Sequence, residues 1–288
     1  MPQALHALAL LVLSIALVAG QPAPPASAAE ALTGLVVMEI EPDAYADREG
    51  IKVGDILRSC EGIEPTSPAA LSRILDRAKY EEKKKSTHME WESGGATRAR
   101  KVPLEQMGLL FRPRLPAKAL AEFRRYQQLE PGGQEAEQTL VAAAKAAEQS
   151  ESWIAAGWLW QQVGSVRGKR RDRAGSVKAL VTASRLLDRS ADTAAQAQIR
   201  RDLSRACMAV NDLDAAERFL ERAREIDAAA KDRMGVAADW NGLAAVSYFR
   251  RDLKQALACN RKALEIRREL DPQSPLTAAS LNNLGLFS

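Results

Sequence analysis

The sequence predicts a small α+β domain followed by an all-α solenoid of helix pairs, so that the chain is mainly helical overall. The first observation is a period of 40 residues, marked by Ala143, Ala183, Ala223 and Ala263. The second is a change at the stiff connector 112–116, after which apolar residues recur at helical instead of strand spacing. A fixed period of this length is typical of repeat proteins, in which each unit buries its apolar face by stacking on the next.

The composition favours binding over chemistry. The 288 residues include 41 basic and 37 acidic side chains, and this balance does not indicate a nucleic-acid partner. Cys60, Cys207 and Cys259 lie far apart, and the histidines are only His6 and His88, so neither a disulfide framework nor a two-histidine metal site is expected. A Cys60–His88 dyad would lack an orienting group. We therefore predict no enzyme, no cofactor, and no catalytic or metal-binding residues.

The N-terminus has the features of an export signal. Residues 7–19 are apolar apart from Ser14, which is too short a run to favour a membrane-spanning helix of about 20 residues. A small-residue, Pro-rich stretch follows, in which Ala26-Ser27-Ala28 fits the cleavage pattern of a signal peptide. We expect residues 1–29 to be a signal peptide and leader, and the protein to be exported to a periplasm, cell surface or medium. No membrane insertion is expected after cleavage, and the alternative is an uncleaved anchor.

Residues 31–113 predict the small α+β domain. Residues 34–40 form a β-branched strand candidate, and residues 51–57 run from a turn into a second strand. Ser67-Pro68 is typical of a capped helix start. Alternation on both sides of Gly94-Gly95 predicts a β-hairpin.

The run from Gly34 to Leu57, Gly-Leu-Val-Val-x-x-Ile-Glu-Pro-Asp continuing to Gly-Ile-Lys-Val-Gly-Asp-Ile-Leu, resembles a bacterial PDZ domain. PDZ domains bind extended C-terminal peptides by adding a strand to a sheet edge. In the circularly permuted bacterial form, the carboxylate-binding loop is similar to Met107-Gly-Leu-Leu-Phe111 here. The resemblance implies a peptide groove formed by Gly108, Leu109, Leu110, Phe111, Leu71 and Leu75. The alternative is that residues 108–111 pack only as a closing strand.

Residues 117–288 predict the helical array, with units near 117–156, 157–196, 197–236 and 237–277 and an incomplete unit at 278–288. Trp240-x-x-Leu243-Ala244 and Leu281-Asn-Asn-Leu-Gly285 resemble tetratricopeptide (TPR) repeats. The C-terminal part is especially similar to the long-period repeats of kinesin light chains and of bacterial proteins that precede caspase-like CHAT domains. The usual first-helix tyrosine is replaced by Cys207 and Ser247.

In TPR proteins the first helix of each pair lines a concave face. Polar residues share one register beside the apolar stripe, and two more follow a turn away. The resemblance implies that they bind a partner, and the alternative is an ordinary solvated face. The residues are Gln161, Arg201, Asn241 and Asn282, with Arg205 and Tyr248.

These features together predict an exported, non-enzymatic scaffold that binds proteins or peptides at two sites. The sequence ends on apolar residues 284–287 in the first turns of a repeat unit, which leaves a second reading open. In that reading the chain is the recognition part of a larger caspase-like (CHAT) or other peptidase whose catalytic region would follow Ser288. A third reading is a purely structural envelope repeat with an inactive groove.

Overall fold

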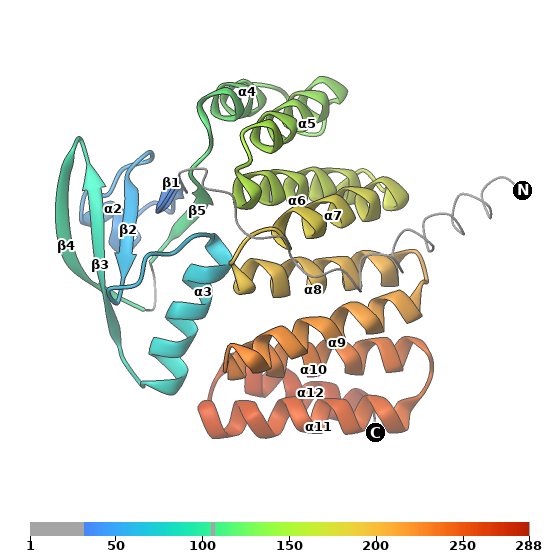
Figure 1. The fold of residues 1–288 in the computed structure, drawn as a ribbon. Helices are drawn as coiled ribbons and strands as arrows, with labels where there is room; N and C mark the ends of the chain where they lie inside the picture. Colours follow the sequence, from blue (N-terminus) through green and yellow to red (C-terminus); the bar gives the residue numbers. More distant parts are fainter. Residues whose placement is uncertain (1–31, 105–106, 288) are drawn as a thin grey trace, which may run out of the picture.

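The computed structural model describes residues 32–104 and 107–287. A five-stranded antiparallel sheet forms the N-terminal domain, and helices α4 to α12 form an elongated stack beside it (Figure 1). The chain is thus mainly helical, with a small sheet followed by a helical solenoid, as predicted. The predicted leader, residues 1–29, lies outside the described residues.

The N-terminal domain holds five strands and two short α-helices, the second of which continues into a π-helix, η2. The strand order is β4-β3-β2-β1-β5, so β4 and β5 are the two edges of the sheet. In chain order the elements are β1 (Leu35–Ile40), α2 (Tyr45–Arg48), β2 (Ile56–Cys60), α3 (Pro68–Asp76), η2 (Arg77–Glu81), β3 (Ser86–Ser93), β4 (Ala96–Pro103) and β5 (Leu109–Pro113).

The predicted local signals have their expected roles in this domain. Ser67 caps α3, because its hydroxyl accepts a hydrogen bond from the backbone N–H of Ala70 at 3.1 Å. The hairpin turns at Gly94 and Gly95, both at positive φ. The second strand begins only at Ile56, because residues 52–55 form a tight turn in which Gly54 has φ +97°. Gly54 tolerates this left-handed conformation because it has no β-carbon.

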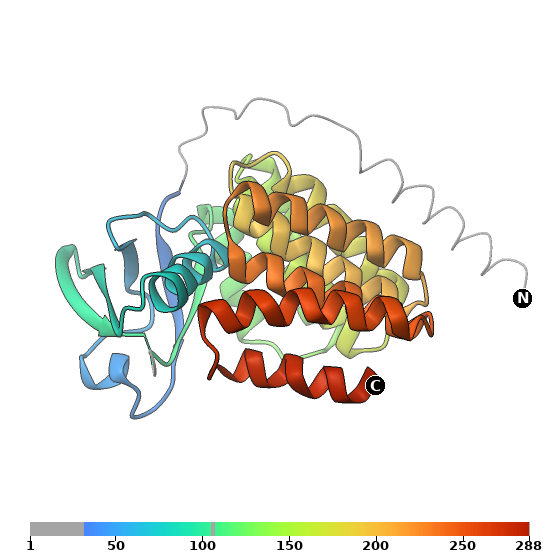
Figure 2. The same cartoon turned by 90° about the horizontal axis from the view of Figure 1, so that it is seen from below.

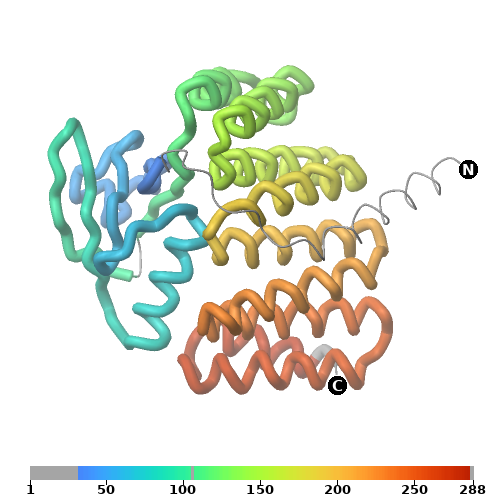
Figure 3. Tube along the Cα trace, viewed as in Figure 1, coloured from blue at the N-terminus to red at the C-terminus, as the bar shows by residue number. Residues whose placement is uncertain are grey.

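Helices α4 to α12 follow one another in antiparallel pairs, and each contacts the next along the chain (Figure 3). We call α4, α6, α8 and α10 the first helices and α5, α7, α9 and α11 the second helices. Their bounds are α4 Ala117–Gln127, α5 Gln134–Gln149, α6 Trp153–Lys169, α7 Arg173–Leu187, α8 Thr193–Ala209, α9 Leu213–Ala229, α10 Arg233–Phe249, α11 Leu253–Leu270 and α12 Pro275–Phe287. The pairs from α6 onward begin at residues 153, 193 and 233, four residues before the expected unit starts.

A half-period of 20 residues underlies the array. Helices α6, α8, α9 and α10 each have 17 residues, and three residues connect α8, α9 and α10 to the next helix. An aspartate caps five successive helices, and its side chain accepts a hydrogen bond from the N–H three residues later. These aspartates are Asp172, Asp192, Asp212, Asp232 and Asp252. The cap fixes where each helix starts, and so maintains the period.

Small residues set the distance between neighbouring helices, both within a pair and between successive pairs. The alanines of the 40-residue period, residues 143, 183, 223 and 263, are all fully buried. A β-carbon on Gly157 would lie 2.5 Å from Leu187, and one on Gly242 would lie 2.6 Å from Leu220. Such distances are closer than packed atoms allow, so these glycines permit the helices to approach.

Candidate functional site

The predicted peptide groove has its residues on β5 and α3, and they differ in accessibility. Leu71 is buried in the core of the N-terminal domain, whereas Leu75 is half-buried. Leu109 and Phe111 pack against the same core, and Phe111 stacks on Trp91 with ring centroids 5.9 Å apart. Leu110 is 58% exposed. Among the described residues, β5 pairs only with β1, so its other edge has no strand partner.

Gly108 is required by the fold. Its φ is +61°, its carbonyl accepts a hydrogen bond from the N–H of Glu41 at 2.8 Å, and a β-carbon on it would collide with the Ala44 side chain. The carboxylate of Glu41 lies close enough to be 3.3 Å from such a β-carbon. A negative charge at this position repels a terminal carboxylate.

The two elements that carry the predicted groove residues, α3 and β5, also contact the solenoid. Helix α3 contacts α8 and β5 contacts α6, while α3 and β5 contact each other. Figures 1 and 2 show α3 between the sheet and the stacked helices. The N-terminal domain is thus seated on the surface formed by α6, α8 and α10, which we call the first-helix surface.

Part of the predicted polar row lies on this surface around a cavity. The cavity has a volume of about 470 Å³ and is lined by α6, α7 and α8. Gln161 and Arg205, which both line it, donate hydrogen bonds to the carboxylate of Asp202, as does Gln198 at 2.9 Å. The sequence placed Gln161 and Arg205 in one group, and the structure joins them through Asp202, which the sequence analysis missed.

The other predicted residues of the row are separate from this cavity. Asn241 accepts a hydrogen bond from the side-chain amide of Asn283 at 3.0 Å, which joins α10 to α12. Tyr248 lies at the end of α10, is 47% exposed and meets the ring of Phe249 edge-on. Asn282 is exposed on α12. The six residues therefore do not form one continuous site.

Arg201 is already occupied by acidic partners. Its Nη1 atom lies 2.5 Å from Oδ2 of Asp227 and 3.1 Å from Oδ1 of Asp239, and both aspartates are fully buried. The pKa of Asp239 is raised to about 8, chiefly by burial, with Arg201 opposing the rise and the Asp227 carboxylate adding to it. Burial also raises the pKa of Asp227. Burial and mutual repulsion thus favour protonation of this carboxylate pair, while Arg201 favours its charged form.

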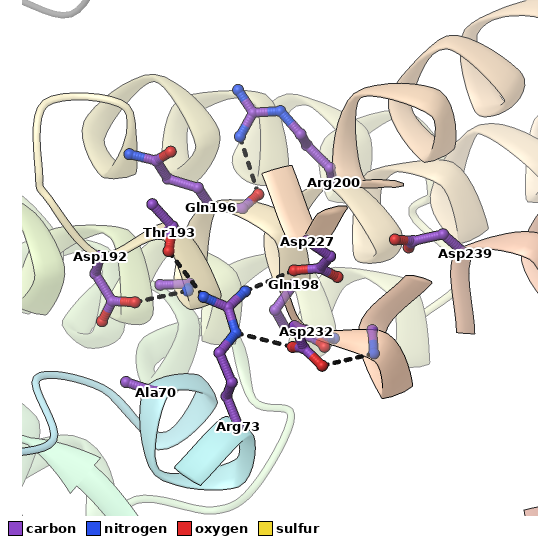
Figure 4. A network of polar contacts seen from close by, with 12 residues as sticks. Ala70, Arg73, Asp192, Thr193, Gln196, Gln198, Arg200, Asp227, Asp232 and Asp239 are labelled. Carbon is purple, nitrogen blue, oxygen red and sulfur yellow. Dashed lines mark hydrogen bonds and ion pairs between the residues drawn. The ribbon is translucent and has the colours of Figure 1, made fainter. Parts of the chain in front are cut away.

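A second arginine reaches the same cluster from the N-terminal domain. Arg73 of α3 places Nη2 2.5 Å from Oδ1 of Asp227 and Nε 2.8 Å from Oδ2 of Asp232, and its Nη1 donates to Thr193 at 2.8 Å (Figure 4). Sequence reasoning missed Arg73, Asp227 and Asp239, since none of them follows the 40-residue period. The available signal was the spacing of Asp192 and Asp232, 40 residues apart at the starts of successive first helices.

Cys60 and His88 differ in accessibility. Cys60 is buried against the Thr87 hydroxyl at 3.3 Å, whereas the side chain of His88 is 73% exposed. Within residues 32–104 and 107–287, no group of three or more histidine, cysteine or acidic residues is placed to hold a metal ion. In the same ranges, no helix combines the length and apolar character needed to cross a bilayer.

Comparison with solved structures finds similar helical arrays. RapI in its apo form is 14% identical with a TM-score of 0.49, and the match covers 59% of this chain and 46% of RapI. A Podospora anserina protein described as a kinesin light chain with nearly identical TPR-like repeats is 16% identical with a TM-score of 0.47, covering 59% of this chain and 83% of that one. BtubC from P. vanneervenii is 14% identical with a TM-score of 0.43, covering 59% and 81%.

No family model matches the sequence, and no curated protein matches it. The chain spans less than half the length of RapI. At these identities and TM-scores the likenesses carry no inference about activity or partners.

Proposed function

We propose that this chain is an exported, non-catalytic scaffold that binds proteins at two sites: a PDZ-like groove and a TPR-type first-helix surface. The observation that carries the proposal is the cavity of about 470 Å³ on the first-helix surface, with Gln161, Asp202 and Arg205 around it. Such a cavity offers both hydrogen-bond donors and acceptors to a partner backbone or side chain. Export is proposed from the leader sequence alone.

The solenoid site is tested by site-specific photo-crosslinking in the intact chain. A photoreactive residue at Gln162, which lines the cavity, is expected to capture a discrete protein. The same residue at Lys254, which is exposed on α11, serves as the control position. Arg205→Glu should abolish capture from Gln162, because it reverses the charge beside Asp202. Equal capture from both positions would contradict a partner site at the cavity.

For the N-terminal site, we propose that an extended peptide adds beside β5, next to α3, with its side chains toward Leu75 and Leu110. Because Glu41 lies at Gly108, the site should prefer peptide amides, or segments internal to a protein, over free C-terminal acids. The groove walls also contact α6 and α8, so the domain is expected to shift when a peptide enters.

The peptide proposal is tested with fluorescent peptide libraries synthesised as matched acids and amides. Leu110→Asp, at an exposed position on β5, should weaken binding, and Ile63→Asp, at an exposed position beyond β2, should not. A Gly108 variant is unsuitable, because a side chain there collides with Ala44. Absence of binding by any peptide at millimolar concentration would leave β5 as a closing strand only.

A further inference from the structure

The outer face of α3 lies on the first-helix surface. Leu71 of this helix faces the core of its own domain, whereas Ala69 packs against the hydrophobic core of the solenoid. Arg73, one turn further along the same face, enters the acidic cluster of Asp227 and Asp232. One helix therefore contributes to the peptide groove with one face and to the solenoid contact with the other.

Two helix caps of the solenoid also hold the N-terminal domain. Asp232 caps α10 with Oδ1, which accepts from the N–H of Gly235 at 2.8 Å, and receives Arg73 on Oδ2 at 2.8 Å. Asp192 caps α8 with Oδ1 in the same way and accepts from the Thr66 hydroxyl on Oδ2 at 2.6 Å. Each carboxylate thus has one oxygen for its helix and one for the docked domain.

Arg73 adds a positive charge to a cluster rich in carboxylates. Asp227 and Asp239 flank Arg201, Asp232 pairs with Arg73, and Asp76 of α3 interacts electrostatically with Asp232 and Arg201. Withdrawal of Arg73 removes one of the two arginines that pair with the fully buried Asp227 carboxylate. A buried charge without a partner is costly, so the open surface would attract another cation.

Packing around the docked helix is incomplete. One cavity of about 240 Å³ lies beside its start, lined by Pro68, Trp158 and Gln198 among others. Another of about 190 Å³ lies along α3, lined by residues of α3 itself and of α8, α10, α11 and α12. Hydrogen bonds from Thr66 and Arg73 hold α3 in place beside these cavities.

We propose that α3 is a built-in ligand of the first-helix surface, and that a partner protein docks there by presenting an arginine in place of Arg73. An arginine is specified because three different nitrogens of Arg73 are used, on two carboxylates and a hydroxyl. The single ammonium of lysine cannot match this fork. The inference deepens the proposed function, on which it rests: displacement of α3 would free the first-helix surface and the groove that α3 borders.

The first experiment measures opening without any partner. Dyes are placed on the full chain at Thr97→Cys in β4 and Lys254→Cys in α11, both exposed, while the native cysteines are buried. Arg73→Glu is expected to lower the energy-transfer efficiency or add a low-efficiency population. Arg77→Glu is the matched control, since the Arg77 side chain is 67% exposed and pairs with Glu82 within its own domain. Unchanged transfer in folded Arg73→Glu protein would overturn the docking role of Arg73.

The second experiment tests whether the surface recognises an arginine. A fluorescent peptide copying residues 64–83 is titrated into full-length Arg73→Glu protein, whose acidic cluster is intact. It should bind there, and bind the unmodified chain more weakly by about ten-fold or more, because the tethered α3 competes at high effective concentration. A peptide carrying lysine at position 73 should bind more weakly than the arginine peptide.

If the peptide bound the unmodified protein and the Arg73→Glu protein equally well, α3 would not occupy the peptide's site. No binding to either chain would reduce α3 to a structural contact, and so overturn the partner proposal even if the dyes report opening. Neither result bears on the 470 Å³ cavity or on the peptide libraries, so failure here is distinguishable from failure of the proposed function.

Discussion

The carboxylate of Asp227 occupies the space that a side chain on Gly235 would need. A β-carbon on Gly235 would collide with the Asp227 carboxylate and lie 2.9 Å from Oδ2 of Asp232. The missing side chain of one residue in α10 thus creates the room in which an aspartate from α9 meets two arginines. Changes at this close contact should alter the free energy of unfolding measurably.

Gly235→Ala should destabilise the fold by roughly 1–3 kcal/mol, because it overpacks a site that is already filled. The expected loss runs against helix propensity, which favours alanine over glycine by about 1 kcal/mol. Gly285→Ala in α12 is the matched control, since no atom lies within 4 Å of its would-be β-carbon. Urea unfolding followed by circular dichroism measures both. A Gly235→Ala protein as stable as the Gly285→Ala protein would contradict the crowding.

Asp227→Asn should cost roughly 3 kcal/mol or more of unfolding free energy at neutral pH, because it removes the charge that buried Arg201 and docked Arg73 share. Asp239→Asn should cost about 1 kcal/mol or less, since a pKa of about 8 favours the neutral form of Asp239 and its neutral replacement keeps the shape. The comparison uses urea denaturation at one pH. Similar losses for both variants would mean that the proton is not on Asp239.

The free energy of unfolding should fall as the pH rises, because Asp239 loses its proton. The folded chain keeps this carboxyl protonated up to a pKa of about 8, whereas the unfolded chain releases the proton near 3.8. The contribution to stability is therefore fully present below pH 3.8 and is lost as the pH rises through about 8. Between about pH 5 and 8, the unfolding free energy of the unmodified chain should fall by roughly 1.4 kcal/mol per pH unit relative to that of the Asp239→Asn protein. Parallel pH profiles for the two proteins would refute this assignment.

Each aspartate cap of the solenoid should make its own measurable contribution to the free energy of unfolding. Asp212→Ala removes the oxygen that accepts from the N–H of Ala215 at 3.0 Å and should cost about 1 kcal/mol. Asp212→Asn retains an accepting oxygen and should change stability much less. Thermal unfolding of both variants makes the comparison. A loss that is the same for alanine and asparagine would point to charge, not to the capping hydrogen bond.

Much of the fold was accessible from the sequence. The 40-residue alanines, the Ser67-Pro68 helix start and the Gly94-Gly95 hairpin all act through neighbours within a few residues or through a regular period, which sequence displays directly. The caps at Asp172, Asp212 and Asp252 are local in the same sense. The aspartates between them, at Asp192 and Asp232, complete a 20-residue series, which became evident once the helix boundaries were known.

The candidate sites were accessible only in part. Gln161 and Arg205 could be grouped by their place in the repeat. Their common partner Asp202 could not be predicted, since it is not part of the repeated pattern. Gly108 was assigned to carboxylate binding from its motif alone. Its contacts with Glu41 and Ala44 depend on where β1 ends against β5, which the motif does not encode.

The sequence by itself determined the small sheet domain, the helical array and its 40-residue period, because these depend on backbone propensity and on burial at regular spacing. Tertiary structure alone decided that α3 lies on the first-helix surface and that Arg73 meets Asp227, a pair separated by 154 positions in the chain. Such a contact depends on the final placement of two whole domains. It depends on opposite charges that meet in a buried space, and this pairing follows no periodic pattern in the sequence.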